Sequence, residues 1–214
     1  MRDHFENTIF DLSKGIGAGP FNCPYRWRGL VWKVDSISYC NDRSVSTQQT
    51  GFSFISQSRK WLPNEIGGLL WFGVDDTYST CYVPFYCGIT EIPKPFRNGT
   101  GTFYDFTWES AFWVFNAVSN WAYSRYSDMI EDIKKKQNSL ETSFLVDNKT
   151  FEETSIKKIM FHQSGIKDEI TEYSNLKANL VVNEWRKLFE NLLMKYLDGN
   201  IRSENGNVTF PGYS

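Results

Sequence analysis

The sequence predicts an α+β protein in which an antiparallel sheet is followed by a layer of helices. Residues 47 to 87 contain three apolar runs with the alternation, or the aromatic and β-branched composition, of strands. From residue 107 to residue 199, apolar side chains recur at three- and four-residue spacing, which is typical of amphipathic helices. The 214 residues include no repeat or linker, so we expect one folding unit with a strand- and loop-rich part at 1–106, a helical part at 107–199 and a tail at 200–214.

Three strands form the centre of the predicted sheet. Thr50 to Ser58 alternates, which places both of its phenylalanines on one face. Gly68 to Val74 carries no polar side chain, so we expect it to be covered on both faces. Thr80 to Cys87 is rich in aromatic residues, but Pro84 restricts it to an edge or a bulge. A further strand is expected earlier in the chain, at Leu30 to Val34.

Four helices are expected after the sheet. Ser110 to Tyr126 is apolar on most faces, which predicts a helix buried between the sheet and other helices. Asp128 to Phe144 has one apolar stripe beside a charged face, and Phe151 to Gln163 is a shorter helix. Lys177 to Tyr196 repeats the striped pattern and is ended by Asp198-Gly199.

The composition excludes some classes of function. The net charge is −2, which does not favour a nucleic-acid partner. No run approaches the roughly 20 apolar residues of a membrane span, and Met1 to Lys14 lacks the apolar core of a signal peptide. Aromatic residues make up 17% of the chain, which indicates a bulky core or, as the alternative, an aromatic-lined binding groove.

The thiols and imidazoles do not form a recognisable metal or cofactor motif. They are Cys23, Cys40, Cys81, Cys87, His4 and His162. No two cysteines have the C-x-x-C spacing, and the histidines are distant from them in sequence, so neither a zinc site nor any other cofactor is expected. The even number of cysteines permits two disulfides, but four buried thiols are the favoured interpretation.

Polar side chains at the strand ends and on the first helix are the candidates for substrate binding. They are Gln48, Gln49, Arg59, Asp75, Asp76 and Asn116. Neutral amides in apolar surroundings can donate to a peptide carbonyl or an oxyanion, or can instead be satisfied core amides that join helix to sheet. Arg59, like Arg43, could bind the carboxylate of a dipeptide, with a surface ion pair as the alternative.

The adjacent carboxylates Asp75 and Asp76 allow two interpretations. They follow an apolar strand directly, which suggests acid/base chemistry at a pocket, whereas an Asp pair can also cap a turn. A nucleophile is harder to find, because the sequence has no G-x-S-x-G motif and the cysteines and histidines have no spacing that supports an internal pair.

Several long stretches resemble one family. The runs QQTGFSFISQSRKWLPNEIGGLLWFGVDD and SAFWVFNAVSNWAYSRY, together with GAGPFNCPYRW, are similar to the C-terminal half of the bacterial dipeptidase A family. These are cysteine dipeptidases of the N-terminal-nucleophile hydrolase superfamily, with secernins as distant relatives. The resemblance runs from about residue 4 to residue 213 and favours a role for Asp75 and Asp76 at the rim of an active site.

The resemblance implies an αββα sandwich of which this chain is the C-terminal portion. It also implies hydrolysis of dipeptides by a cysteine at the start of the mature chain, whereas this sequence begins Met1-Arg2-Asp3. We therefore expect the chain to lack activity alone, with the N-terminal part of the enzyme and a dipeptide as partners. The alternative is a non-catalytic module that binds a peptide or a glycan on the same scaffold.

The same resemblance predicts an open sheet edge. Without the strand that carries the nucleophile, a neighbouring strand would expose unpaired backbone groups, and the chain would be poorly stable or would self-associate as a homo-oligomer. Phe52, Phe54, Leu70 and Phe72 are expected near this gap, whereas Trp71 is expected to be buried between layers.

Overall fold

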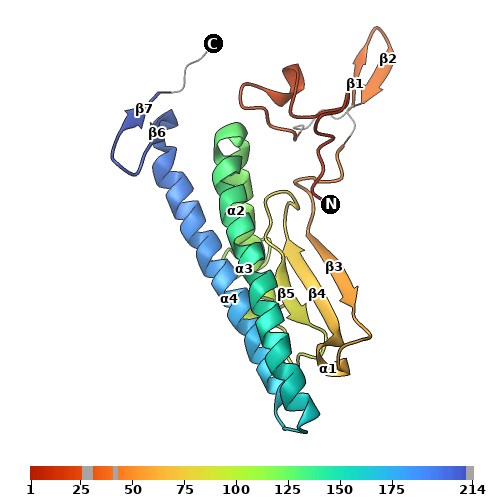
Figure 1. The fold of residues 1–214 in the computed structure, drawn as a ribbon. Helices are drawn as coiled ribbons and strands as arrows, with labels where there is room; N and C mark the ends of the chain where they lie inside the picture. The colour runs from red at the N-terminus through yellow and green to blue at the C-terminus, as the bar shows by residue number, and fades with distance from the viewer. Residues whose placement is uncertain (26–30, 41–42, 211–214) are drawn as a thin grey trace.

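The computed structural model describes residues 1–25, 31–40 and 43–210, and confirms the α+β class. Its main sheet has three antiparallel strands in the order β3 (Phe52–Ser58), β4 (Gly68–Val74) and β5 (Val83–Tyr86). Three long helices follow in the sequence and pack beside this sheet (Figure 1). The second sheet of an αββα sandwich stays a prediction, because the other two sheets in the described part of the chain are two-stranded hairpins.

The backbone hydrogen bonds of the main sheet show which residues of β3 and β5 bond to β4. The Arg59 N–H donates to the carbonyl of Gly67, and the Asp75 N–H donates to the carbonyl of Gly51. Hydrogen-bonded pairs alternate along an antiparallel ladder, so the odd-numbered residues of β3 bond to β4. On the other side of β4, Pro84 is opposite Trp71 at a position that does not bond to β4. Its missing N–H therefore costs no ladder bond, and the expected edge position is confirmed among the described strands.

The two faces of β4 are covered unequally. Leu69 and Trp71 are buried on the face toward the long helices, as expected for Trp71. Leu70 and Phe72 on the opposite face are only half-buried. The prediction that this strand is covered on both faces is therefore wrong for one face, where neighbouring rings and a short 3-10 helix give only partial cover.

The helices are fewer and longer than the sequence pattern indicates. They are α2 (Ala111–Tyr123), α3 (Tyr126–Met160) and α4 (Ile166–Lys195). The sequence pattern predicts two separate helices in this region, whereas α3 is continuous. It is not interrupted because residues 126–160 contain no glycine or proline. The start of α4 at Ile166 is earlier than the expected Lys177, since Gly165 with φ 93° precedes it.

The remaining elements are short. They are the 3-10 helices η1 (Ile16–Ala18), η2 (Lys94–Phe96) and η3 (Leu197–Gly199), the α-helix α1 (Asn64–Gly67) and the strands β1 (Val31–Val34), β2 (Ile37–Cys40), β6 (Ile201–Arg202) and β7 (Val208–Thr209). The β1–β2 and β6–β7 hairpins are separate from the main sheet. The predicted strand at Leu30 to Val34 corresponds to β1, with Leu30 itself outside the described residues.

The core lies where the helices meet the sheet. Phe115 of α2 stacks on Trp185 of α4, with ring centroids 4.8 Å apart. Tyr86 of β5 contacts the rings of Phe151 and Tyr173 on α3 and α4. The high aromatic content therefore fills a core, which joins β5 to the helical layer. No helix in the described ranges is long and apolar enough to cross a membrane.

The cysteines are divided between core and surface. Cys23 and Cys81 are buried, whereas Cys40 and Cys87 are exposed. The expectation of four buried thiols is therefore correct for two of them. Burial holds the pKa of Cys81 well above its ordinary value.

Candidate functional site

Asp75 and Asp76 follow the end of β4 and face different parts of the molecule. Asp75 is 1% exposed and lies against α2, where its carboxylate accepts hydrogen bonds from Asn116 Nδ2 at 2.8 Å and Ser119 Oγ at 2.5 Å. Burial raises the pKa of Asp75 to about 6, although the two donors act in the opposite direction. Its backbone has φ 64°, in the left-handed region that aspartate tolerates better than most residues.

Asp76 is the centre of a buried network. Its Oδ2 accepts from the hydroxyl of Tyr25 at 2.6 Å, and its Oδ1 accepts from Ser46 Oγ at 3.0 Å. Tyr123 of α2 donates to the same carboxylate at 3.3 Å, and the Tyr78 N–H donates at 3.0 Å. These donors come from three separate parts of the chain, so Asp76 joins the N-terminal segment and α2 to the end of β4.

The network continues from Tyr25 to His4. The Tyr25 hydroxyl has one hydrogen, which it donates to Asp76, so it accepts from His4 Nε2 at 2.9 Å. Burial lowers the pKa of His4, although Asp76 and Glu6 act to raise it. Near neutral pH the imidazole is therefore uncharged and donates through Nε2.

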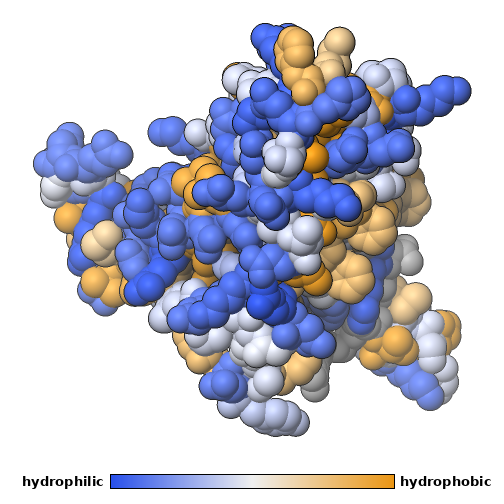
Figure 2. Space-filling view, turned by 90° about the horizontal axis from the view of Figure 1, so that it is seen from below, coloured by the Kyte–Doolittle hydropathy of each residue, from blue (hydrophilic) through white to orange (hydrophobic). Residues whose placement is uncertain are grey.

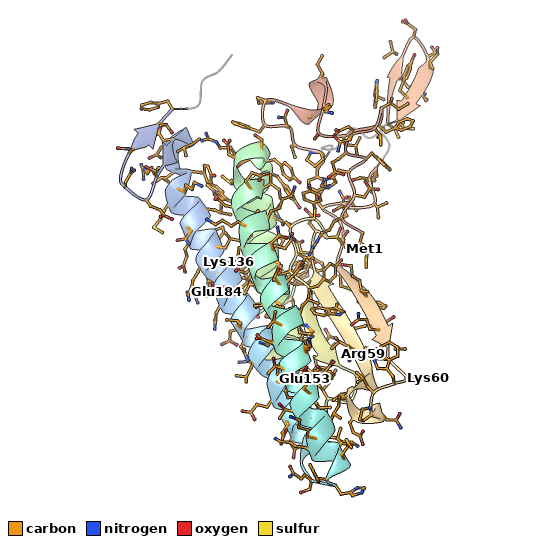
Figure 3. All side chains as sticks on the ribbon, viewed as in Figure 1. Met1, Arg59, Lys60, Lys136, Glu153 and Glu184 are labelled. Carbon is orange, nitrogen blue, oxygen red and sulfur yellow. The ribbon has the colours of Figure 1, made fainter. Side chains whose placement is uncertain are left out.

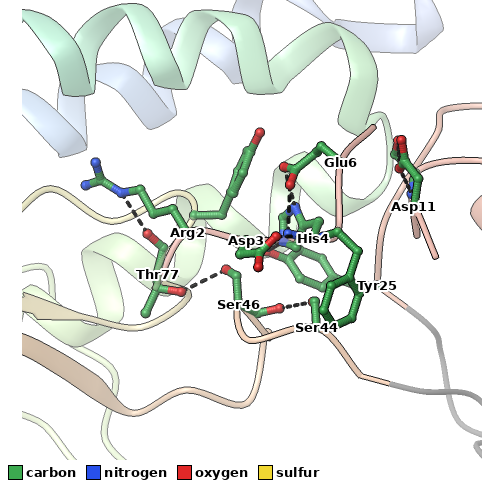
Figure 4. A network of polar contacts seen from close by, with 12 residues as sticks. Arg2, Asp3, His4, Glu6, Asp11, Tyr25, Ser44, Ser46 and Thr77 are labelled. Carbon is green, nitrogen blue, oxygen red and sulfur yellow. Dashed lines mark hydrogen bonds and ion pairs between the residues drawn. The ribbon is translucent and has the colours of Figure 1, made fainter. Parts of the chain in front are cut away.

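A second connection holds the first residues of the chain against the strand end (Figure 4). The Arg2 guanidinium donates to the carbonyls of Thr77 and Thr80 and forms an ion pair with Glu141 of α3 at 2.5 Å. Thr77 Oγ1 is 2.8 Å from Ser46 Oγ, which ties this connection to the Asp76 network. Residues distant in sequence are thus locked together at one end of the sheet.

The six candidate residues do not form a single cluster. Asp75, Asp76 and Asn116 lie together, and Gln48 and Gln49 are in the loop that leads to Gly51, whose carbonyl bonds to Asp75. Gln49 is exposed and Gln48 is half-buried, and both interact with Thr47 Oγ1.

Arg59 lies at the end of the sheet opposite to Met1 (Figure 3). Its guanidinium is paired with Glu152 of α3 at 2.5 Å and donates to the carbonyl of Ile66. Arg43, the other arginine considered for a carboxylate, is exposed. Of the candidates at the Asp75 end, Gln49 is exposed, and Gln48 and Asn116 are half-buried.

Sequence patterns did not identify several members of the site. They are His4, Tyr25, Ser46, Ser119 and Tyr123. Ser119 and Tyr123 are one turn apart on α2, and with Asn116 they form an i, i+3, i+7 series that faces the end of β4. That spacing of polar groups in an apolar helix was the available signal, whereas Tyr25 and Ser46 lie in loops without periodicity.

A cavity of about 530 Å³ opens beside this site, between β3, β4 and α3. Its walls are mostly apolar and include Met1, Ile55, Trp71, Tyr82 and Leu145. Trp71 Nε1 donates to Gln57 Oε1 at 2.9 Å, so the indole is fixed across the two strands. The described residues hold no group of three or more acidic, histidine or cysteine side chains arranged for a metal ion.

The arrangement fixes polar groups but does not by itself complete a catalytic centre. Asn116 Nδ2 has two hydrogens, of which one is committed to Asp75, so the amide can also donate to a ligand carbonyl.

Residues 1–139 match the sequence profile of peptidase family C69. No curated protein sequence matches the chain.

Proposed function

Because the chain belongs to peptidase family C69, we propose that it forms the substrate-binding portion of a cysteine dipeptidase. The thiolate of an N-terminal cysteine, supplied by a segment outside this sequence, attacks the peptide carbonyl. The amine of the second amino acid leaves with a proton, and water then hydrolyses the acyl-enzyme to release the first amino acid and regenerate the thiol.

One observation carries this proposal. The family match covers residues 1–139, which include all six candidate residues and the network around Asp76. The family is one of peptidases, so the substrate contains a peptide bond. The resemblance of the WFGVDD and QQTGFSF stretches to dipeptidases supports the narrower choice of a dipeptide.

Cys81 is poorly suited to be this nucleophile. Burial raises the pKa of Cys81, which makes it a poor thiolate at neutral pH. The imidazole of His4 is engaged by Tyr25, and His162 is exposed at the far end of α3. We assign Asn116 a role in contacting the substrate. Asp75, which accepts from the Asn116 amide, and Ser119, which donates to Asp75, are the positioning residues.

Activity of the chain tests the source of the nucleophile. A panel of dipeptides with uncharged side chains, incubated with the chain, should give no free amino acids above the rate of a buffer blank. Hydrolysis that disappears in any one of the Cys23→Ala, Cys40→Ala, Cys81→Ala or Cys87→Ala variants would show that the nucleophile lies within this chain.

Calorimetric titration with the same dipeptides tests the binding site. We expect Asn116→Ala to weaken binding about tenfold, the loss of one hydrogen bond of about 1.4 kcal/mol. Asn120→Ala is the matched control, because Asn120 lies one turn further along α2, is exposed, and its side-chain amide donates to the Asn116 carbonyl. Equal affinities for both variants would exclude Asn116 as a substrate contact. Binding without turnover after the nucleophile segment is supplied would favour the non-catalytic module.

A further inference from the structure

Two asparagines in the sequence are followed directly by glycine, and the two pairs have different surroundings. They are Asn98-Gly99 in the loop between β5 and α2, and Asn205-Gly206 in the hairpin between β6 and β7. Glycine has no side chain to shield its nitrogen, so this nitrogen can reach the side-chain amide carbon of the asparagine before it. Both pairs are exposed. Hydrophilic side chains cover much of the surface seen from below (Figure 2), so exposure alone does not single out a reactive asparagine.

The Asn98-Gly99 pair lies in a turn that leaves its reacting groups without hydrogen bonds. The Thr100 N–H closes this turn by donating to the Arg97 carbonyl at 3.2 Å, and Thr100 Oγ1 donates to the Lys94 carbonyl at 2.8 Å. Among the described residues, nothing forms a hydrogen bond with the Asn98 side chain or the Gly99 N–H. A Cβ on Gly99 would meet no atom within 4 Å beyond its chain neighbours. The two groups therefore have space to approach each other.

The Asn205-Gly206 pair is held in place by hydrogen bonds to both of its reacting groups. The Gly206 N–H donates to the Ser203 carbonyl at 3.0 Å. Asn205 Oδ1 accepts from Ser203 Oγ and, at 3.3 Å, from the Asn207 N–H. These bonds must break before the Gly206 nitrogen can turn toward the Asn205 amide, and each has a cost. The hairpin pair is therefore a protected counterpart of Asn98 within the same chain.

We propose that Asn98 is a site of spontaneous deamidation. Hydroxide takes the proton of the Gly99 N–H, and the Gly99 nitrogen attacks Cγ of Asn98. The bond from Cγ to the side-chain nitrogen breaks, and this nitrogen takes up a proton from water and leaves as ammonia. Water then opens the resulting succinimide ring at either carbonyl, which gives aspartate or isoaspartate at this position. Water is the only co-reactant of the two steps.

The modification changes both the charge and the backbone of the loop. The net charge of −2 becomes −3, because one carboxylate is added. This carboxylate is adjacent in sequence to Arg97, whose guanidinium donates to Glu91 at 3.3 Å, so it competes with Glu91 for the cation. Isoaspartate also inserts one methylene group into the main chain, within the turn that the Thr100 N–H closes.

Peptide mapping by mass spectrometry, during incubation of the chain at mildly alkaline pH, measures deamidation at both asparagines. Asn98 should react about tenfold faster than Asn205, the factor that corresponds to about 1.4 kcal/mol for the hydrogen bonds that must break in the hairpin. The same incubation in concentrated urea removes the fold, and the two rates should then be similar. Anion-exchange chromatography follows the added negative charge in the intact chain.

Two variants separate the site from its protection. Asn98→Gln should remove the early acidic species, because glutamine would have to close a larger ring. Ser203→Ala removes one hydrogen bond to Asn205 Oδ1, so it should speed up the reaction of Asn205 and leave Asn98 unchanged. A folded chain in which Asn98 keeps its amide, or in which Asn205 reacts as fast, would overturn the proposal. A rate difference that persists in urea would also overturn it, because the neighbours in sequence would then be the cause.

Discussion

β5 and β3 flank the same central strand, yet they meet their surroundings in opposite ways. All four residues of β5 are buried, and the strand contacts α3 and α4. Only Ser53 is buried in β3. Proline lies in the covered strand, at a position where its missing N–H costs no bond to β4, and the uncovered strand has no protective residue. Cover by the helices, rather than composition, therefore separates a core strand from an exposed edge strand in this sheet.

The largest expected effect on the free energy of unfolding is seen by comparing two phenylalanines, one on each side of β4. Phe85→Ala removes a ring that is 7% exposed, so we expect a loss of about 3–5 kcal/mol in the free energy of unfolding. Phe54→Ala removes a half-exposed ring and should cost about 1 kcal/mol or less. Urea unfolding of both variants gives the two values. Equal losses would mean that the edges are equally covered, which contradicts the comparison.

The next effect is a pH dependence of stability at Asp75, whose N–H donates to the Gly51 carbonyl at the start of β3. Burial raises the pKa of Asp75 from 3.8 to about 6, so the folded chain binds this proton more tightly than the unfolded chain does. Its contribution is therefore fully present below about pH 4 and is lost as the pH rises through 6, by about 3 kcal/mol in total.

Asp75→Asn removes this titration, and asparagine also tolerates the left-handed backbone at this position. The stability of the variant relative to the unmodified chain should thus be more favourable at pH 7.5 than at pH 4 by up to about 3 kcal/mol. Urea unfolding at the two pH values measures this difference. A constant difference would show that Asp75 has no raised pKa in the folded chain.

A smaller effect is expected at the far end of the sheet. Glu152 of α3 accepts hydrogen bonds from Arg59, next to β3, and from the Tyr86 hydroxyl of β5, so it holds both outer strands to one helix. Glu152→Ala should cost about 2–3 kcal/mol, because a largely buried guanidinium loses its partner. Glu153→Ala is the control, since Glu153 is adjacent but exposed (Figure 3), and should have little effect on thermal unfolding.

The smallest effect on stability is expected for a charge on the open edge. Ser56 is exposed, so Ser56→Lys should change the free energy of unfolding by about 0.5 kcal/mol or less. Urea unfolding of the variant measures this change. A large loss of stability in the monomer would indicate that β3 is covered after all.

The site was only partly predictable from the sequence. Asn116 and the adjacent aspartates were identified because polar residues stand out against an apolar strand and helix. Tyr25 and Ser46 were not, because a hydroxyl in a loop has no pattern that indicates its partner 30 to 51 residues away. The substrate role of all six candidates stays a prediction.

The sequence by itself determined the bounds of the central strand, the alternation of β3 and the family. These depend on local periodicity and on long runs of matching residues, which are properties of neighbouring positions. Only the tertiary structure decided which face of β4 is covered, where the two aspartates point and why Arg59 is paired. Its partner Glu152 is 93 residues away, and such a contact depends on how the helices pack on the sheet, which short-range patterns do not encode.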